Sequence, residues 1–113
     1  MVGDRYGEGA NLSSLGSTYA TLGDNSRAIE FYEQALRLAR TIGDHQGEAA
    51  TLHNLGSTYY DMGDIRRAIE LYEQSLNTKR EIGDRLGEGS ILGNIGNAYA
   101  ALGDTRQIGR AHV

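Results

Sequence analysis

The chain carries stripes of apolar and small residues at helical spacing. Members of each stripe stand three or four residues apart, which places them on one face of an α-helix and leaves polar residues on the other face. In the middle of the chain one stripe consists of Leu52, Leu55, Gly56 and Tyr59, and the next of Ala68, Ile69, Tyr72 and Leu76. Each such stretch of sequence therefore predicts two amphipathic helices.

Gly-Asp pairs separate the predicted helices. Glycine adopts the left-handed conformation that ends a helix, and aspartate caps the N-terminus of the next one. Loops this short make neighbouring helices antiparallel. The pairs begin at Gly3, Gly23, Gly43, Gly63, Gly83 and Gly103. The sequence thus predicts helices at residues 5–21, 25–41, 45–61, 65–81 and 85–101, with a sixth helix beginning after the last pair.

The whole pattern recurs with a period of forty residues. The sequence Leu-Gly-Ser-Thr-Tyr of residues 15–19 returns at 55–59, and it returns as Ile-Gly-Asn-Ala-Tyr at 95–99. More than half of the first unit recurs unchanged in the second. Self-similarity at a fixed period is typical of repeat architectures. We therefore expect an array with units at 3–42 and 43–82 and an incomplete unit at 83–107.

The last six residues break the period. Past residue 107 the repeat requires an Ala-Ile-Glu equivalent, but residues 108–113 read Ile-Gly-Arg-Ala-His-Val. This hexapeptide resembles one reading-frame translation of a common sequencing-library adapter. We expect residues 1–107 to form the repeat array and residues 108–113 to be a non-native tail.

Glycines and tyrosines also recur at fixed places in the units. Glycine inside a helix permits close packing, so we expect a partner helix backbone to approach Gly7, Gly16, Gly47, Gly56, Gly87 and Gly96. The tyrosines on the stripes are expected to be core residues, and these are Tyr19, Tyr32, Tyr59, Tyr72 and Tyr99. Tyr60 is expected to be exposed.

The string Leu-Gly-x-x-Tyr-x-x-x-Gly-Asp-x-x-x-Ala-Ile-x-x-Tyr-x-x-x-Leu, from Leu55 to Leu76, resembles the consensus of the tetratricopeptide repeat family. It is matched in the first unit and as far as Asp104 in the third. Leucine stands at positions 12, 52 and 92 where the family often has tryptophan, and the usual proline after the second helix is missing. The forty-residue period resembles the lengthened subgroup that includes Leu-Gly-Asn repeat scaffolds, kinesin light chains and bacterial signalling proteins. The resemblance implies an all-α fold, an α-solenoid of antiparallel helix pairs in a right-handed superhelix, with about two and a half repeats.

In this family the concave face is built from the first helix of each pair, so the resemblance implies where a ligand peptide would bind. The corresponding positions are polar and small, which suits hydrogen bonding to a peptide. They vary between units while the stripes do not, which favours a specialised surface over the alternative of merely solvated helix faces. The expected peptide-binding residues are Ser13, Ser14, Ser17, Thr21, His53, Asn54, Ser57, Tyr60, Asp61, Asn94 and Asn97, with Gly93 beside them.

Composition excludes several other partners. The formal net charge of −4 gives no electrostatic basis for binding nucleic acid or an anionic membrane surface. No apolar run approaches the roughly 18 residues that a spanning helix needs. The absence of cysteine removes disulfides and thiolate chemistry, and it fits a reducing compartment. We expect a cytoplasmic chain.

Candidate chemistry is weak. The Gly-Asp-x-x-Gly-Glu hexads at Gly3, Gly43 and Gly83 superficially suggest phosphate or metal loops, but no Lys-Ser/Thr follows them and they precede helices without a strand, so capping is favoured. His53 and Asp61 lie eight residues apart on one predicted helix, about 12 Å along its axis, too far to share a metal ion. No catalytic constellation is present, so we expect no enzyme activity, no metal and no cofactor.

The leading functional hypothesis is a protein-interaction module that binds a peptide or helix in the concave groove, as part of a larger scaffold or signalling protein. The alternative is a regulatory or self-association segment of a multidomain bacterial signalling protein. Self-association would use an uncovered edge at Leu92, Ile95 and Tyr99. The sequence does not identify the partner.

Overall fold

The computed structural model describes the backbone of residues 4–111 and the side chains of residues 4–103. Its helices are α1 (Arg5–Thr21), α2 (Asn25–Ile42), α3 (His45–Asp61), α4 (Ile65–Glu81) and α5 (Arg85–Ala111). Residues 4–111 contain no strand. The all-α prediction is confirmed, and the first four helices match their predicted bounds to within one residue.

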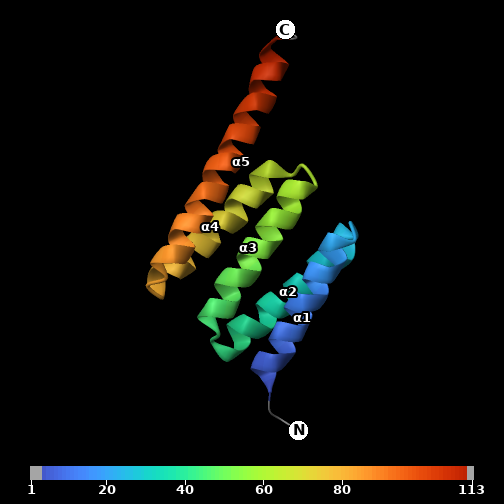
Figure 1. The fold of residues 1–113 in the computed structure, drawn as a ribbon, viewed down its shortest axis with the longest axis vertical. Coiled ribbons are helices and arrows are strands. Elements are labelled where there is room, and N and C mark those ends of the chain that lie inside the picture. Colours follow the sequence, from blue (N-terminus) through green and yellow to red (C-terminus); the bar gives the residue numbers. More distant parts are fainter. Residues whose placement is uncertain (1–3, 112–113) are drawn as a thin grey trace.

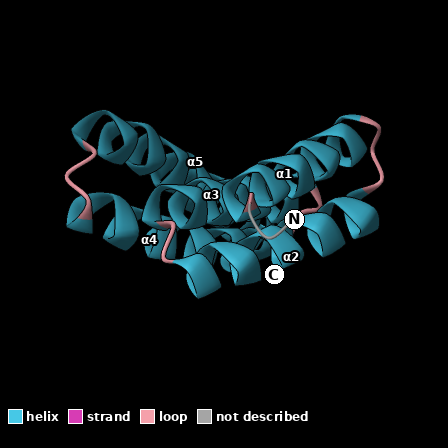
Figure 2. Cartoon of the chain, turned by 90° about the horizontal axis from the view of Figure 1, so that it is seen from below, coloured by secondary structure: helices cyan, strands magenta, loops and turns pink. Residues whose placement is uncertain are grey.

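Consecutive helices pack on one another as antiparallel neighbours along an elongated molecule (Figure 1). Seen from below, the first helices of the units, α1, α3 and α5, lie in one layer, and the second helices, α2 and α4, lie in the other (Figure 2). Direct contact between α1 and α3 is slight. The predicted solenoid of helix pairs is therefore confirmed, and the first helices share one exposed face.

The Gly-Asp pairs act as the sequence predicts. The glycines at the four inter-helix turns have left-handed φ values between 71° and 87°, and they are Gly23, Gly43, Gly63 and Gly83. Each following aspartate accepts a hydrogen bond from the backbone N–H three residues later. The hexads are therefore helix caps, and the capping interpretation is confirmed.

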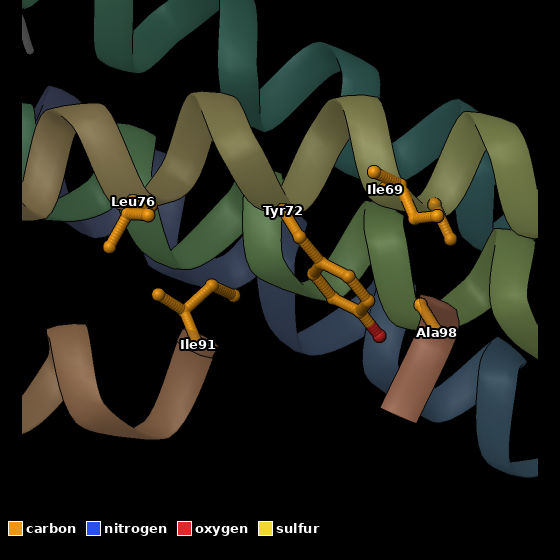
Figure 3. Packing of buried hydrophobic residues seen from close by; sticks show 6 residues of the cluster. Ile69, Tyr72, Leu76, Ile91 and Ala98 are labelled. Atoms are coloured by element: carbon orange, nitrogen blue, oxygen red, sulfur yellow. The ribbon is translucent and has the colours of Figure 1, made fainter. Parts of the chain in front are cut away.

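Two clusters of buried side chains hold the layers together. One joins α4 to α5, and in Figure 3 Tyr72 reaches from α4 toward α5 between Ile91 and Ala98. The other joins α2, α3 and α4 through Ala28, Tyr32, Leu52, Leu55 and Leu71. Both clusters contain residues of the predicted stripes. The apolar face of an amphipathic helix is buried where a neighbouring helix packs against it.

The helical glycines make closer contacts with side chains than with helix backbones. A Cβ added to Gly56 would lie 2.7 Å from the Tyr72 ring, and one added to Gly16 would lie 2.7 Å from the Tyr32 ring. A Cβ on Gly7, Gly47 or Gly87 would meet the capping aspartate of the same helix. The expected close approach of a partner helix backbone is confirmed at Gly56, where a Cβ would also lie 3.3 Å from the Ala68 carbonyl oxygen. At Gly7, Gly16, Gly47 and Gly87 it was wrong as to the partner, because a tyrosine ring or the capping aspartate lies closest. Among the described residues, nothing lies within 4 Å of a Cβ placed on Gly96.

The end of α5 differs from the prediction. The sequence predicts a turn at Gly103, but the helix continues through it to Ala111. In the first two units an apolar stripe that begins with Ala-Ile-Glu follows the turn, and it packs the second helix against the first. No Ala-Ile-Glu equivalent follows Gly103. Without that apolar stripe, folding back would bury little surface, and the helix continues. The expectation that residues 108–113 are a non-native tail lies outside the described side chains and stays a prediction.

Two tyrosines also differ from expectation. Tyr99 is 52% exposed instead of buried, because no second helix of its unit covers it within the described residues, and its hydroxyl donates to Glu73 Oε1 at 3.2 Å. Tyr60 is partly buried against the α4–α5 cluster instead of exposed. Tyr32 and Tyr72 are buried as predicted, and Tyr19 and Tyr59 are partly buried.

Candidate functional site

A pocket of about 430 Å³ opens between α3 and α5. The last turn of α3 forms one wall, the middle of α5 forms the other, and the Tyr72 side chain of α4 reaches between them. The lining residues are Ser57, Tyr60, Asp61, Tyr72, Asn94, Asn97, Ala100 and Ala101. The pocket thus combines hydroxyl and amide groups, two tyrosines, two alanines and one carboxylate.

The Tyr72 hydroxyl is fixed at the base of the pocket. It shares a 3.0 Å hydrogen bond with Ser57 Oγ, and the same pair occurs one unit earlier between Tyr32 and Ser17 at 2.9 Å. Burial raises the pKa of Tyr72, the hydrogen bond with Ser57 lowers it, and the negative charge of Asp61 adds to the rise. The Asp61 charge therefore acts on the interior of the pocket.

His53 and Asn94 tie α3 to α5 at the pocket edge. Asn94 Nδ2 lies 2.8 Å from His53 Nε2. An amide nitrogen can only donate, so Nε2 accepts and the imidazole is neutral with its proton on Nδ1. Burial, followed by the charge of Lys79, lowers the pKa of His53. The ring also lies edge-on to Tyr72, with ring centroids 5.8 Å apart.

A second hollow, of about 180 Å³, lies between α1 and α3. Its lining is mostly apolar or small, and its polar members are Arg5, Ser13, Asp44, Thr51 and Asn54. The apolar and small members are Tyr6, Gly9, Ala10, Ala35, Leu38, Ala39, Ile42, Gly47 and Ala50. One unit further on, Ala39 is replaced by Lys79, which is 8% exposed. The junction between the first and second units thus has an alanine where the junction between the second and third units has a lysine.

The structure gathers most of the predicted binding residues into these two hollows. The α3–α5 pocket contains Ser57, Tyr60, Asp61, Asn94 and Asn97, and the α1–α3 hollow contains Ser13 and Asn54. His53 lines neither hollow but orients Asn94. Four further expected positions line neither hollow, namely Ser14, Ser17, Thr21 and Gly93. The role of all the expected residues in binding stays a prediction.

Sequence reasoning missed three residues of the main pocket. Tyr72 was assigned to the core, yet its ring is buried while the side chain also lines the pocket. Ala100 and Ala101 were not singled out, because alanine offers no chemistry of its own. Alignment of the repeats could have found them, because Ala100 and Ala101 are the third-unit equivalents of Tyr60 and Asp61. In the structure the two alanines line the pocket opposite these larger residues.

Other kinds of site find no support in the described residues. Among the part of the chain that was searched, no group of three or more histidine, cysteine or acidic side chains could hold a metal ion. Over the same residues, no helix has the length and apolar character needed to cross a membrane.

A family model described as the tetratricopeptide repeat matches residues 7–81 and 48–108. These matches span most of the chain, which therefore belongs to the tetratricopeptide repeat family. Tetratricopeptide repeats are helical repeats that generally act as protein–protein interaction modules. No curated protein matches the sequence.

Solved structures show the same fold. The TPR domain of Arabidopsis FLU matches with a TM-score of 0.83 and 23% identity over 95% of this chain and 90% of that one. A STAND signal transduction ATPase with a tetratricopeptide repeat sensor, from Pyrococcus horikoshii, matches with a TM-score of 0.78 and 24% identity over 87% and 15%. BtubC (BKLC) from P. vanneervenii matches with a TM-score of 0.64 and 21% identity over 92% and 47%. The chain thus spans nearly all of the FLU TPR domain but under half of the length of the other two chains.

Proposed function

We propose that this chain binds a peptide segment of another protein in the face formed by α1, α3 and α5, with the α3–α5 pocket as its main contact. The observation that carries this proposal is the repeat itself. Positions on the packing stripes hardly change between units, whereas two of the pocket positions change from Ala20 and Thr21 to Tyr60 and Asp61. Positions that differ between units beside constant packing stripes favour recognition of a particular ligand.

The test is selection from a phage-displayed random peptide library on the full 113-residue chain. Selected peptides are then synthesised, and their effect on backbone amide resonances is mapped. We expect shifts concentrated on α3 and α5 around Ser57 and Asn97. Shifts confined to the outer surface of α2 and α4 would contradict the proposal.

A matched pair of variants locates the site. Ala100→Phe places an aromatic ring in the pocket from the α5 wall, and we expect it to abolish binding. Asn77→Phe adds the same ring to α4 at an exposed position that lines none of the pockets described, so it should bind as well as the parent chain. Circular dichroism of both variants checks that the helices are intact. Equal losses in the two variants would count against the pocket.

Self-association is a second proposal, supported by the open stripe of α5. Leu92 is 46% exposed and Tyr99 is 52% exposed. Leu52, which is equivalent to Leu92 in the second unit, is buried by neighbouring helices. The α5 helix therefore exposes apolar surface that is covered on α3. Light scattering over a concentration series tests this, with Leu92→Arg as the disrupting variant. A monomer at every concentration would exclude it.

We further propose that the array belongs to a scaffold or signalling protein. Support comes from the Pyrococcus horikoshii protein, whose tetratricopeptide repeat is described as the sensor of a signal transduction ATPase. The full open reading frame tests this, because the neighbouring domains would identify the class of protein.

A further inference from the structure

Among the described residues that line the α3–α5 pocket, Asp61 alone is charged. Among residues 4–103, no side chain forms an ion pair or a hydrogen bond with its carboxylate. An ionised carboxylate only accepts hydrogen bonds, and this one has no donor from the described protein side chains. The pocket therefore presents an unmatched negative charge to whatever enters it.

Local structure does not explain the presence of this aspartate. Asp61 is the last residue of α3, Met62 is the C-cap, and Asp64 caps the next helix. The carbonyl end of a helix carries partial negative charge, so a carboxylate there is unfavourable. Asp61 is exposed, its carboxylate neither caps a helix nor forms an ion pair with a described residue, and its position opposes the helix dipole.

The repeat provides an internal comparison. At the positions of Tyr60 and Asp61, the first unit has Ala20 and Thr21, and the third has Ala100 and Ala101. The large and charged pair on α3 thus faces two alanines on α5 across the pocket. Of the three units, only the second has an aromatic ring and a carboxylate at these two positions.

We infer that this pocket binds an arginine or lysine side chain of the peptide ligand. This inference rests on the proposed function and adds the chemical class of the residue that is recognised. The Asp61 carboxylate would pair with the cation, the ring of Tyr60 would offer it an aromatic face, and the alanines would contact its aliphatic stem. The formal net charge of −4 also favours approach of a basic segment.

The experiment compares the library selections of three full-length chains. They are the parent chain, Asp61→Asn, which keeps the shape and removes the charge, and Glu30→Gln, which removes a charge from an exposed position on α2 outside the pocket. We expect peptides from the parent chain and from Glu30→Gln to share a basic residue at one position. Peptides from Asp61→Asn should lose that preference.

A synthetic peptide from the parent selection then gives the size of the effect. Replacing its basic residue with neutral citrulline should weaken binding to the parent chain about five- to tenfold, the combined effect of a partly exposed ion pair and a cation–π contact. The same replacement should change binding to Asp61→Asn less than about twofold.

The outcomes separate this inference from the proposed function. Binders without a basic preference, or an equal preference in Asp61→Asn, would overturn the inference and leave peptide binding intact. Failure to select any peptide with a folded chain would overturn the proposed function, and the inference would fall with it.

Discussion

The ring of Tyr72 packs directly on the backbone of Gly56, so closely that a Cβ on this glycine would lie 2.7 Å from a ring carbon. Tyr72 is 3% exposed and held on its other side by the α4–α5 cluster, so it cannot easily move away. We expect Gly56→Ala to lower the free energy of unfolding by about 1–2 kcal/mol, since overpacking outweighs the gain in helix propensity. Urea denaturation followed by circular dichroism measures it.

Gly96→Ala is the matched control. Gly96 occupies the equivalent position in α5, and no described atom lies within 4 Å of a Cβ built there. This substitution should raise the free energy of unfolding by about 0.5–1 kcal/mol, the usual benefit of alanine over glycine in a helix. The same sign of change in both variants would contradict the close Tyr72 contact.

The contrast between these two glycines illustrates what the sequence predicts about the fold. The period and the Gly-Asp pairs predict the helix bounds because they are local signals, and the structure confirms them from α1 to α4. The local signal fails at Gly103, because a turn also needs a following helix that can be buried. The contact of Gly56 with the Tyr72 ring likewise depends on tertiary packing, and the spacing of residues along the sequence does not predict it.

The candidate site was predictable to a similar degree. The resemblance to the tetratricopeptide repeat family implied that Ser57, Asn94 and Asn97 lie on the face of the first helices, and the structure brings them into one pocket. The pocket itself depends on Tyr60 standing opposite Ala100 across two helices. Which residues face each other between units follows from helix packing, and the sequence of one unit does not contain it.

The shared hydrogen bond between Ser57 and Tyr72 gives a second prediction. Its oxygens are 3.0 Å apart in a partly buried setting. Ser57→Ala and Tyr72→Phe should each lower the free energy of unfolding, and the double variant should lose less than the sum. We expect a coupling energy of about 0.5–1.5 kcal/mol from the double-mutant cycle. Strictly additive losses would mean that the bond contributes nothing to stability.

His53 makes the stability of the fold depend on pH. Its pKa in the folded chain is lowered from the ordinary histidine value of 6.5, chiefly by burial and then by Lys79, while Asn94 donates to its neutral Nε2. On acidification below about 6.5 the unfolded chain takes up a proton before the folded one does. The stability from neutral His53 is therefore complete above that pH and is lost as pH falls toward the lowered pKa.

Two measurements check this pH dependence. The imidazole resonances of His53 should titrate with a midpoint below 6.5. In denaturation series between about pH 7.5 and 5.5, His53→Gln should lose less stability than the parent chain, since glutamine keeps an acceptor for Asn94 and does not titrate in this range. A midpoint at or above 6.5 would show that the ring is not held in its neutral form.

Asp61 gives the last prediction, which separates a structural from a functional role for the carboxylate. Because it stands at the C-terminal end of α3 without a partner among the described side chains, Asp61→Asn should raise the free energy of unfolding by about 0.3–1 kcal/mol, as removal of an unfavourable interaction with the helix dipole would. Glu30→Gln, near the opposite end of its helix, should leave stability unchanged or slightly lower it. If Asp61→Asn instead destabilises the chain, the carboxylate helps to hold the fold, and the case for its role in recognition is weakened.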